Sequence, residues 1–396
     1  MNLGVEKKLL RPAFLLGVLA LFLSVPAVLG QSVKDLPPPP PLWRPKPTPT
    51  PTPPKPPESS EIDTVKISSN LVMVPVSVTD QSGQAVQGLK IPDFRLSEEG
   101  KQQEITSLGD PEQVPLAIAI LFDISSSVGK HGFFASQQNA AAAFLRQVMK
   151  PSDRAAIFTI TGEPVVVQPL DTAEASTKKI LTIPPAVAHV PTAFYDTVIA
   201  AAKYLTDKAP SNYRRVIVVL SDGDDNFSNQ IRDSALADFN ASLAEQNAKG
   251  TPASGANAKQ AAQPTTRGQL RSLLQQRHQQ AVAAVQKAVQ QADVIFYSVN
   301  PGGPSIKLNQ IAMRAERGME AIAETTGGTA FVPDSDADLE RVFRQVAAEL
   351  RGQYLLQYYG NSEAPPNVFR KIQVAVPTRG DVRVRARQGY YPKKPD

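Results

Sequence analysis

The alternation of apolar and polar positions changes character along the chain. Residues 71–79 are rich in strand-forming side chains and residues 93–97 alternate, and turn signals follow each segment, which predicts short strands. The runs 116–122, 216–220 and 294–299 are apolar at nearly every position, and segments with apolar residues at helical spacing separate them. Buried strands that alternate with helices predict an α/β fold, a doubly wound, mostly parallel sheet with helices on both faces.

The pattern returns to short strands after residue 352. Strands are predicted at 354–359, 369–376 and 382–387. Three strands alone make a poor core, so we expect them to pack with the strands of residues 62–108 as a small accessory β-sandwich built from both ends of the chain. Pro75 predicts an edge strand or a bulge in the first run. The alternating arginines of 382–387 fit either a solvated strand face or a patch that binds anions.

The first 30 residues have the pattern of a secretory signal peptide. Positive residues precede an apolar run at 13–23, and small residues precede position 31. The alternative is an uncleaved membrane anchor, although the 18 residues from 13 to 30 are short for a span and contain Pro26. The pattern therefore predicts an extracytoplasmic protein, which is periplasmic, exposed on the cell surface or secreted, and touches the membrane only if the signal peptide stays uncleaved. No cysteine follows the leader, so no lipid anchor is expected.

A proline-rich linker follows the leader. Residues 37–57 contain 13 of the 36 prolines, and such a segment adopts an extended polyproline II conformation, which spans on the order of 65 Å. A spacer is the favoured interpretation, and a ligand for a proline-recognising partner is the alternative. The predicted organisation is a signal peptide (1–30), a linker (31–61), an N-terminal β region (62–112), an α/β domain (113–350) with a low-complexity surface insertion (235–268), and a C-terminal β region (351–396).

Composition excludes several classes of site. The chain has no cysteine, which excludes disulfides, thiol nucleophiles and thiolate metal sites, and it has only three scattered histidines. The formal charge of +5 falls to +3 without the leader, which is too little to argue for nucleic-acid binding.

Candidate ligands follow two of the apolar runs. Residues 123–127 read Asp-Ile-Ser-Ser-Ser, an Asp-x-Ser-x-Ser motif, and Asp222 follows the run that ends at Leu220. Open α/β sheets bind ligands at the carboxyl ends of their strands. Carboxylate and hydroxyl oxygens are hard ligands, which suit Mg²⁺ better than zinc.

These motifs resemble the von Willebrand factor type A (VWFA) domain. Asp-x-Ser-x-Ser is that family's metal ion-dependent adhesion site (MIDAS) motif, Thr-Ala-Phe-Tyr-Asp at 192–196 resembles its second loop, and Val-Val-Leu-Ser-Asp-Gly at 218–223 resembles its third. The resemblance implies a metal site formed by Asp123, Ser125, Ser127, Thr192 and Asp222. It implies Mg²⁺, or else Mn²⁺ or Ca²⁺, with an open position for a partner's carboxylate.

The likeness covers about residues 114–350 and has one departure. The family often has Gly-Gly before the threonine of the second loop, whereas this chain has Val190-Pro191. The flanking segments extend the likeness to a bacterial family of secreted VWFA-related proteins.

Some of these residues also have plainer interpretations. Serines 125–127 could cap the following helix. Asp224 and Asp225 are expected to be exposed turn residues, and His189 is expected to be a loop residue and not a ligand.

The favoured function is an exported, metal-dependent protein-binding module of the adhesion type, a monomer with no catalytic activity. It would bind a protein that offers an acidic side chain. One alternative is a structural cell-envelope protein whose metal only stiffens the loops. The other is a hydrolase on the same scaffold, against which no Gly-x-Gly-x-x-Gly, P-loop or Gly-x-Ser-x-Gly motif follows a strand.

Overall fold

A computed structural model describes residues 71–125, 134–185, 190–229, 231, 267–303, 310–361, 365 and 367–392. The predicted signal peptide and linker, Ser127, His189 and most of the predicted insertion lie outside these residues. The described residues all belong to one compact unit, Lys66–Asp396. None of the helices in this part of the chain combines the length and apolar character needed to cross a membrane.

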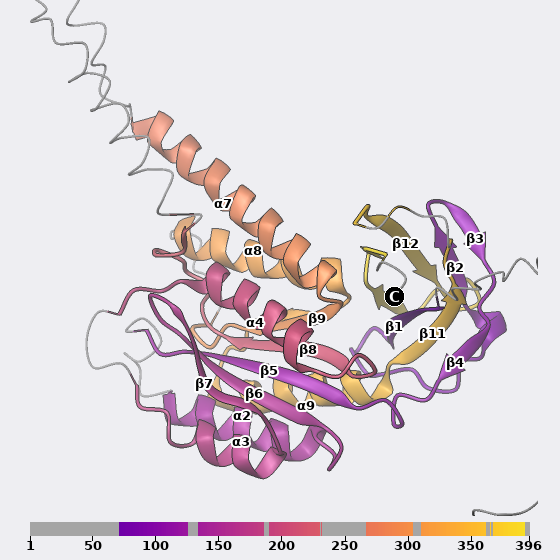
Figure 1. The fold of residues 1–396 in the computed structure, drawn as a ribbon, viewed down its shortest axis with the longest axis horizontal. Coiled ribbons are helices and arrows are strands. Elements are labelled where there is room, and N and C mark those ends of the chain that lie inside the picture. The colour runs from indigo at the N-terminus through magenta and orange to yellow at the C-terminus, as the bar shows by residue number, and fades with distance from the viewer. Residues whose placement is uncertain are drawn as a thin grey trace, which may run out of the picture. The chain divides into compact units, whose positions relative to one another are not determined.

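A six-stranded sheet forms the centre of the α/β part (Figure 1). Its order is β10-β9-β8-β5-β6-β7, and every neighbouring pair is parallel except β6 and β7. The strands are β5 (Leu116–Asp123), β6 (Arg154–Ile160), β7 (Pro164–Asp171), β8 (Arg214–Leu220), β9 (Val294–Val299) and β10 (Ala330–Phe331). The predicted doubly wound, mostly parallel sheet is confirmed.

Helices cover both faces of this sheet, which explains its continuous apolar runs. On β5, Ile118 and Ile120 face one core together with α2 (Phe134–Val148), α3 (Ala173–Ile180) and α9 (Asp336–Gly352). Ala119 and Leu121 face a second core with α4 (Phe194–Lys208), α7 (Arg267–Gln291) and α8 (Gln310–Thr326). Figure 1 shows the two helical layers on opposite sides of the sheet. Because both faces are covered, all eight residues of β5 are buried.

Strands from before and after the α/β part form the accessory β-sandwich. One sheet has the order β13-β1-β11-β4 and the other β14-β12-β2-β3. The strands are β1 (Leu71–Thr79), β2 (Arg95–Glu98), β3 (Lys101–Gln103), β4 (Ser107–Gly109), β11 (Tyr354–Tyr359), β12 (Arg370–Ala375), β13 (Arg383–Ala386) and β14 (Gly389–Tyr390), with a 3-10 helix η1 (Ile91–Asp93) before β2. Val74, Leu96, Leu356 and Ile372 share one buried core between the sheets. The predicted sandwich from both ends of the chain is therefore confirmed.

Pro75 does not mark an edge strand or a bulge. Strand β1 lies in the middle of its sheet, pairing with β11 from Leu71 to Val76 without a register shift. Its other neighbour, β13, pairs only from Val76 onward. Pro75 therefore sits where β1 has a single neighbour, and its missing N–H costs no ladder hydrogen bond.

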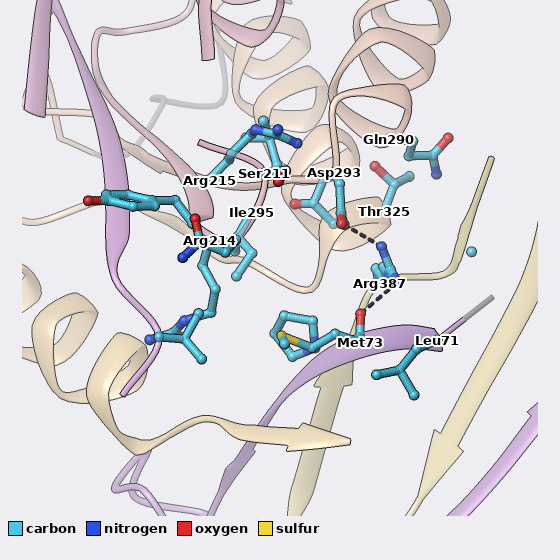
Figure 2. Close-up of a pocket in the computed structure, with 17 residues that line it drawn as sticks. Leu71, Met73, Ser211, Arg214, Arg215, Gln290, Asp293, Ile295, Thr325 and Arg387 are labelled. Carbon is cyan, nitrogen blue, oxygen red and sulfur yellow. Dashed lines mark hydrogen bonds and ion pairs between the residues drawn. The ribbon is translucent and has the colours of Figure 1, made fainter. Parts of the chain in front are cut away.

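The arginines of 382–387 correct a second prediction. Arg385 forms an ion pair of 2.7 Å with the buried Glu349 of α9. Arg387 pairs with Asp293 and donates to the carbonyl of Met73 at 2.6 Å (Figure 2). Both side chains therefore hold the sandwich against the α/β part, instead of forming a solvated face or an anion-binding patch. Arg383 alone is exposed as the solvated-face alternative expected.

A cavity of about 260 Å³ lies beside this contact, and Figure 2 draws the residues that line it. It is lined by residues at the start of β8 and β9, including Arg214, Arg215 and Ile295, and by Leu71 and Met73 of β1. Of the four predicted ligands that the structure describes, none lines it. Asp123 and Asp222 lie at the opposite end of the strands.

Candidate functional site

Two predicted ligands meet at the carboxyl edge of the central sheet. Strand β5 ends at Asp123, and its parallel neighbour β8 is followed directly by Ser221 and Asp222. The chain leaves β5 toward β6 on one side and later returns to β8 on the other, so the two ends flank a topological switch point. Ligand sites of open α/β sheets lie at such points.

Asp123 is completely buried and firmly oriented. Its Oδ2 accepts a hydrogen bond of 2.6 Å from the Ser221 hydroxyl, and its Oδ1 accepts one of 2.8 Å from the Ser125 N–H. Asp123 and Ser221 are both fully inaccessible, and Ser125 is 4% exposed. Ser221, which is not one of the predicted ligands, therefore fixes the orientation of Asp123.

The electrostatics of this pair favour a cation. Burial and, to a smaller extent, the neighbouring charge of Asp222 together raise the pKa of Asp123 to about 6, although the hydrogen bonds from Ser221 and Ser125 oppose the rise. Two carboxylates that repel each other, one of them buried, are stabilised in their ionised form when a positive charge lies between them.

Thr192 is held against the loop that carries Asp222. The Thr192 N–H donates to Asn226 Oδ1 at 2.9 Å, and its carbonyl accepts from the N–H groups of Asn226 and Phe227, each at 3.1 Å. Thr192 itself is buried. The structure thus brings the predicted second loop to the predicted third loop.

Asp225 is not the exposed turn residue that the sequence suggested. Its Oδ2 accepts from the Tyr195 N–H at 2.8 Å and from the Ser228 hydroxyl at 2.5 Å, and burial raises its pKa. The N-cap residue of α4, Ala193, has no side-chain cap, so Asp225 supplies from another loop the acceptor that an N-cap side chain normally provides. Asp224 is also partly buried, and burial together with the charges of Asp222 and Asp225 raises its pKa.

Four of the five predicted ligands lie in the described residues: Asp123, Ser125, Thr192 and Asp222. That part of the chain contains no cluster of three or more His, Cys, Asp or Glu side chains that could hold a metal ion. The predicted set differs in kind, since it combines two carboxylates with three hydroxyls. Its assignment as a metal site stays a prediction.

The comparisons with known proteins agree with the observed fold. Residues 117–248 match the family model of the von Willebrand factor type A domain, which covers about a third of the chain. A comparison with curated proteins gives no match.

Several solved structures are similar to the chain at low identity. A von Willebrand factor type A structure from Catenulispora acidiphila is 12% identical with a TM-score of 0.42, and the match covers 83% of this chain and 64% of that one. The vWF domain of the type V pili tip protein Mfa5 from Porphyromonas gingivalis is 15% identical with a TM-score of 0.38, covering 59% and 94%. Proximal thread matrix protein 1 from the mussel byssus, with a zinc-occupied MIDAS motif, is 14% identical with a TM-score of 0.35, covering 59% and 47%.

The matched segment starts within β5 and contains Asp123, Thr192 and Asp222. Strands β9 and β10, which follow it in the chain, complete the same sheet. The chain therefore contains a von Willebrand factor type A domain, matched over residues 117–248.

Proposed function

We propose that the chain is an exported, metal-dependent protein-binding module of the adhesion type with no catalytic activity. Asp123, Ser125, Ser127, Thr192 and Asp222 would bind a divalent cation, Mg²⁺ in the first place and Mn²⁺ or Ca²⁺ as alternatives. The observation that supports this proposal is the fully buried Asp123, whose pKa is raised by burial and by the adjacent Asp222.

The donor set fits a hard divalent cation. Its oxygens are carboxylates and hydroxyls, the ligand types that Mg²⁺ and Ca²⁺ prefer. Ser221 and the Ser125 N–H hold Asp123 in one orientation, as residues around a metal ligand commonly do. When bound, the cation would neutralise the two carboxylates and offer an open position to a carboxylate of the partner.

The partner that fits such a site is a protein with an accessible acidic side chain. The predicted leader and proline-rich linker of residues 1–61 would export the module and hold it away from a surface. With a formal charge of +5 for the whole chain, nothing favours a nucleic acid.

The first experiment measures metal binding by the intact chain. Mg²⁺ at about one hundred times its Kd is expected to raise the free energy of unfolding by about 2.7 kcal/mol, because it binds only the folded state. Asp123→Asn should abolish the effect, and Asp207→Asn, which changes an exposed aspartate on α4, should leave it intact. Isothermal titration that detects no Mg²⁺, Mn²⁺ or Ca²⁺ binding would refute the metal site.

The second experiment tests the adhesion role. The intact chain is used to capture partners from an extracytoplasmic extract with Mg²⁺ or with EDTA, alongside Asp123→Asn and Asp207→Asn. A partner set that depends on Mg²⁺ and on Asp123 is the expected result. Identical sets in all arms would favour the structural alternative, in which the metal only stiffens the loops.

A further inference from the structure

Two loops of the proposed metal site are joined to each other by hydrogen bonds that involve none of the proposed ligand side chains. We infer that Asn226 is a positioning residue that fixes Thr192 against the loop of Asp222. This inference rests on the proposed function, since it concerns the same site. Asn226 was not among the candidates that the sequence identified.

Asn226 contacts the backbone of Thr192 on both sides. Its Oδ1 accepts from the Thr192 N–H at 2.9 Å, and its own N–H donates to the Thr192 carbonyl at 3.1 Å. Thr192 is only 4% exposed, and its N–H would lose its hydrogen-bond acceptor if the Asn226 side chain were shortened. The asparagine side chain therefore fixes the backbone from which the Thr192 hydroxyl projects.

A second set of bonds holds Asn226 in place. Asp225 accepts from the Tyr195 N–H in the first turn of α4, and its other oxygen accepts from the N–H groups of Phe227 and Ser228. The Ser228 hydroxyl in turn accepts from the Asp196 N–H at 3.0 Å. The loop that carries Asn226 is thus attached to the start of α4, just after Thr192.

This arrangement couples two proposed ligands that lie 30 residues apart in sequence. Thr192 precedes α4 and Asp222 follows β8, and the segment from Asp225 to Ser228 binds the first to the second. A binding site needs its ligands held within about 0.5 Å of their productive positions. Because Asn226 carries no charge, its contribution can be removed without changing the electrostatics of the two carboxylates.

The test compares Asn226→Ala with Asn226→Asp in the intact chain. Alanine removes the acceptor, whereas aspartate keeps an oxygen at the same position. The probe is Mg²⁺ alone, measured by isothermal titration. Asn226→Ala should weaken Mg²⁺ binding by about tenfold, the lower end of the range for residues that support metal ligands. Asn226→Asp should bind at least as tightly as the unchanged chain, because it keeps the acceptor and adds a negative charge.

Amide hydrogen exchange at Thr192 provides a readout that needs no metal. Its N–H should exchange about tenfold faster in Asn226→Ala, from the loss of its acceptor, and at the original rate in Asn226→Asp. Unchanged exchange in Asn226→Ala would overturn the inference, as would an unchanged Mg²⁺ affinity in a chain that does bind Mg²⁺. If the unchanged chain binds no divalent metal, the proposed function fails. In that case, faster exchange in Asn226→Ala would show that Asn226 only stabilises the loop, and its role at a metal site would be overturned as well.

Discussion

Buried carboxylates have different neighbours in the β-sandwich and at the carboxyl edge of the α/β sheet. In the sandwich, Glu98 is 2% exposed and forms an ion pair of 2.7 Å with Arg370. Its second oxygen accepts from the hydroxyl of Tyr358 at 2.8 Å and from that of Tyr390 at 3.3 Å. The charge of Glu98 is therefore compensated within the chain.

The same holds where the sandwich meets the α/β part and at one place within the α/β part itself. Glu349 pairs with Arg385, and the buried Asp153 pairs with Arg351 while accepting from the N–H of Leu116. Each of these carboxylates is removed from water, and each has a guanidinium beside it.

Asp123 is buried as deeply, but its surroundings are of another kind. In the described part of the chain, its surroundings include the Ser221 hydroxyl, the N–H and hydroxyl of Ser125 and the charge of Asp222. A buried charge without a counter-charge lowers the stability of the folded state. Among the described residues, Glu98 has such a counter-charge beside it, whereas Asp123 does not. Under the proposed function, the compensating charge at this edge would be the bound cation.

The largest expected effect comes from breaking the compensated pair. Arg370→Met should lower the free energy of unfolding by about 3 kcal/mol, because it leaves Glu98 buried without its counter-charge. The free energy is measured by urea unfolding in EDTA. The matched control Arg383→Met, at an exposed position of the same sandwich, should change stability by less than about 0.5 kcal/mol. A loss equal to that of the control would show that Glu98 needs no partner.

Removing the charge of Asp123 should change the free energy of unfolding in the opposite direction. In EDTA, Asp123→Asn is expected to raise the free energy of unfolding by about 1 kcal/mol, because it relieves the desolvation of the carboxylate and its repulsion by Asp222. With excess Mg²⁺ the unchanged chain should become the more stable of the two. If Asp123→Asn is strongly destabilised in EDTA, the carboxylate serves the fold and the contrast with Glu98 disappears.

The smallest effect concerns His278, a half-buried group whose surroundings favour its neutral form. His278 Nε2 lies 3.1 Å from the carbonyl of Arg314, which can only accept, so Nδ1 is the acceptor for the Tyr195 hydroxyl at 2.7 Å. Burial lowers the pKa of His278, and the charge of Arg314 lowers it further, although the hydrogen bond to the Arg314 carbonyl opposes this. Protonation would also remove the acceptor that Tyr195 uses.

The pH dependence of stability follows from this lowered pKa. Below about pH 6.5 His278 binds a proton more readily in the unfolded chain than in the folded chain. The contribution of His278 to the free energy of unfolding is therefore present above that pH and is lost as the pH falls. The difference in free energy of unfolding between the unchanged chain and His278→Gln should therefore shrink from pH 7 to pH 5. A difference that grows in that interval would show that the histidine is charged in the folded state.

The fold was largely predictable because its signals are local. A run such as 116–122 is apolar at each position only if both faces of the strand are covered, and this predicted the central sheet. The sandwich followed from counting strands, since neither end of the chain has enough of them for a core of its own. The prediction for Pro75 was wrong because it depended on where the neighbouring strand β13 ends, which no local pattern reveals.

The candidate site was only partly predictable. Asp123, Thr192 and Asp222 follow strands or precede a helix in a recognisable order, so the sequence singled them out. Asn226 and Asp225 look like ordinary turn residues, and their roles depend on hydrogen bonds to a loop 30 residues earlier. The only sequence signal was the density of polar residues after β8, which does not say what they bind.

The sequence by itself determined the order of strands and helices and the oxygen-only chemistry of the candidate site, because hydrophobic periodicity and side-chain type are properties of short segments. Tertiary structure alone decided which buried charges are compensated. Arg385 in β13 and Arg387 just after it have the alternating spacing of arginines on a solvated strand, yet they pair with Glu349 and Asp293. Those partners come from distant segments, and only the packing of the sandwich against the α/β part brings the charges together.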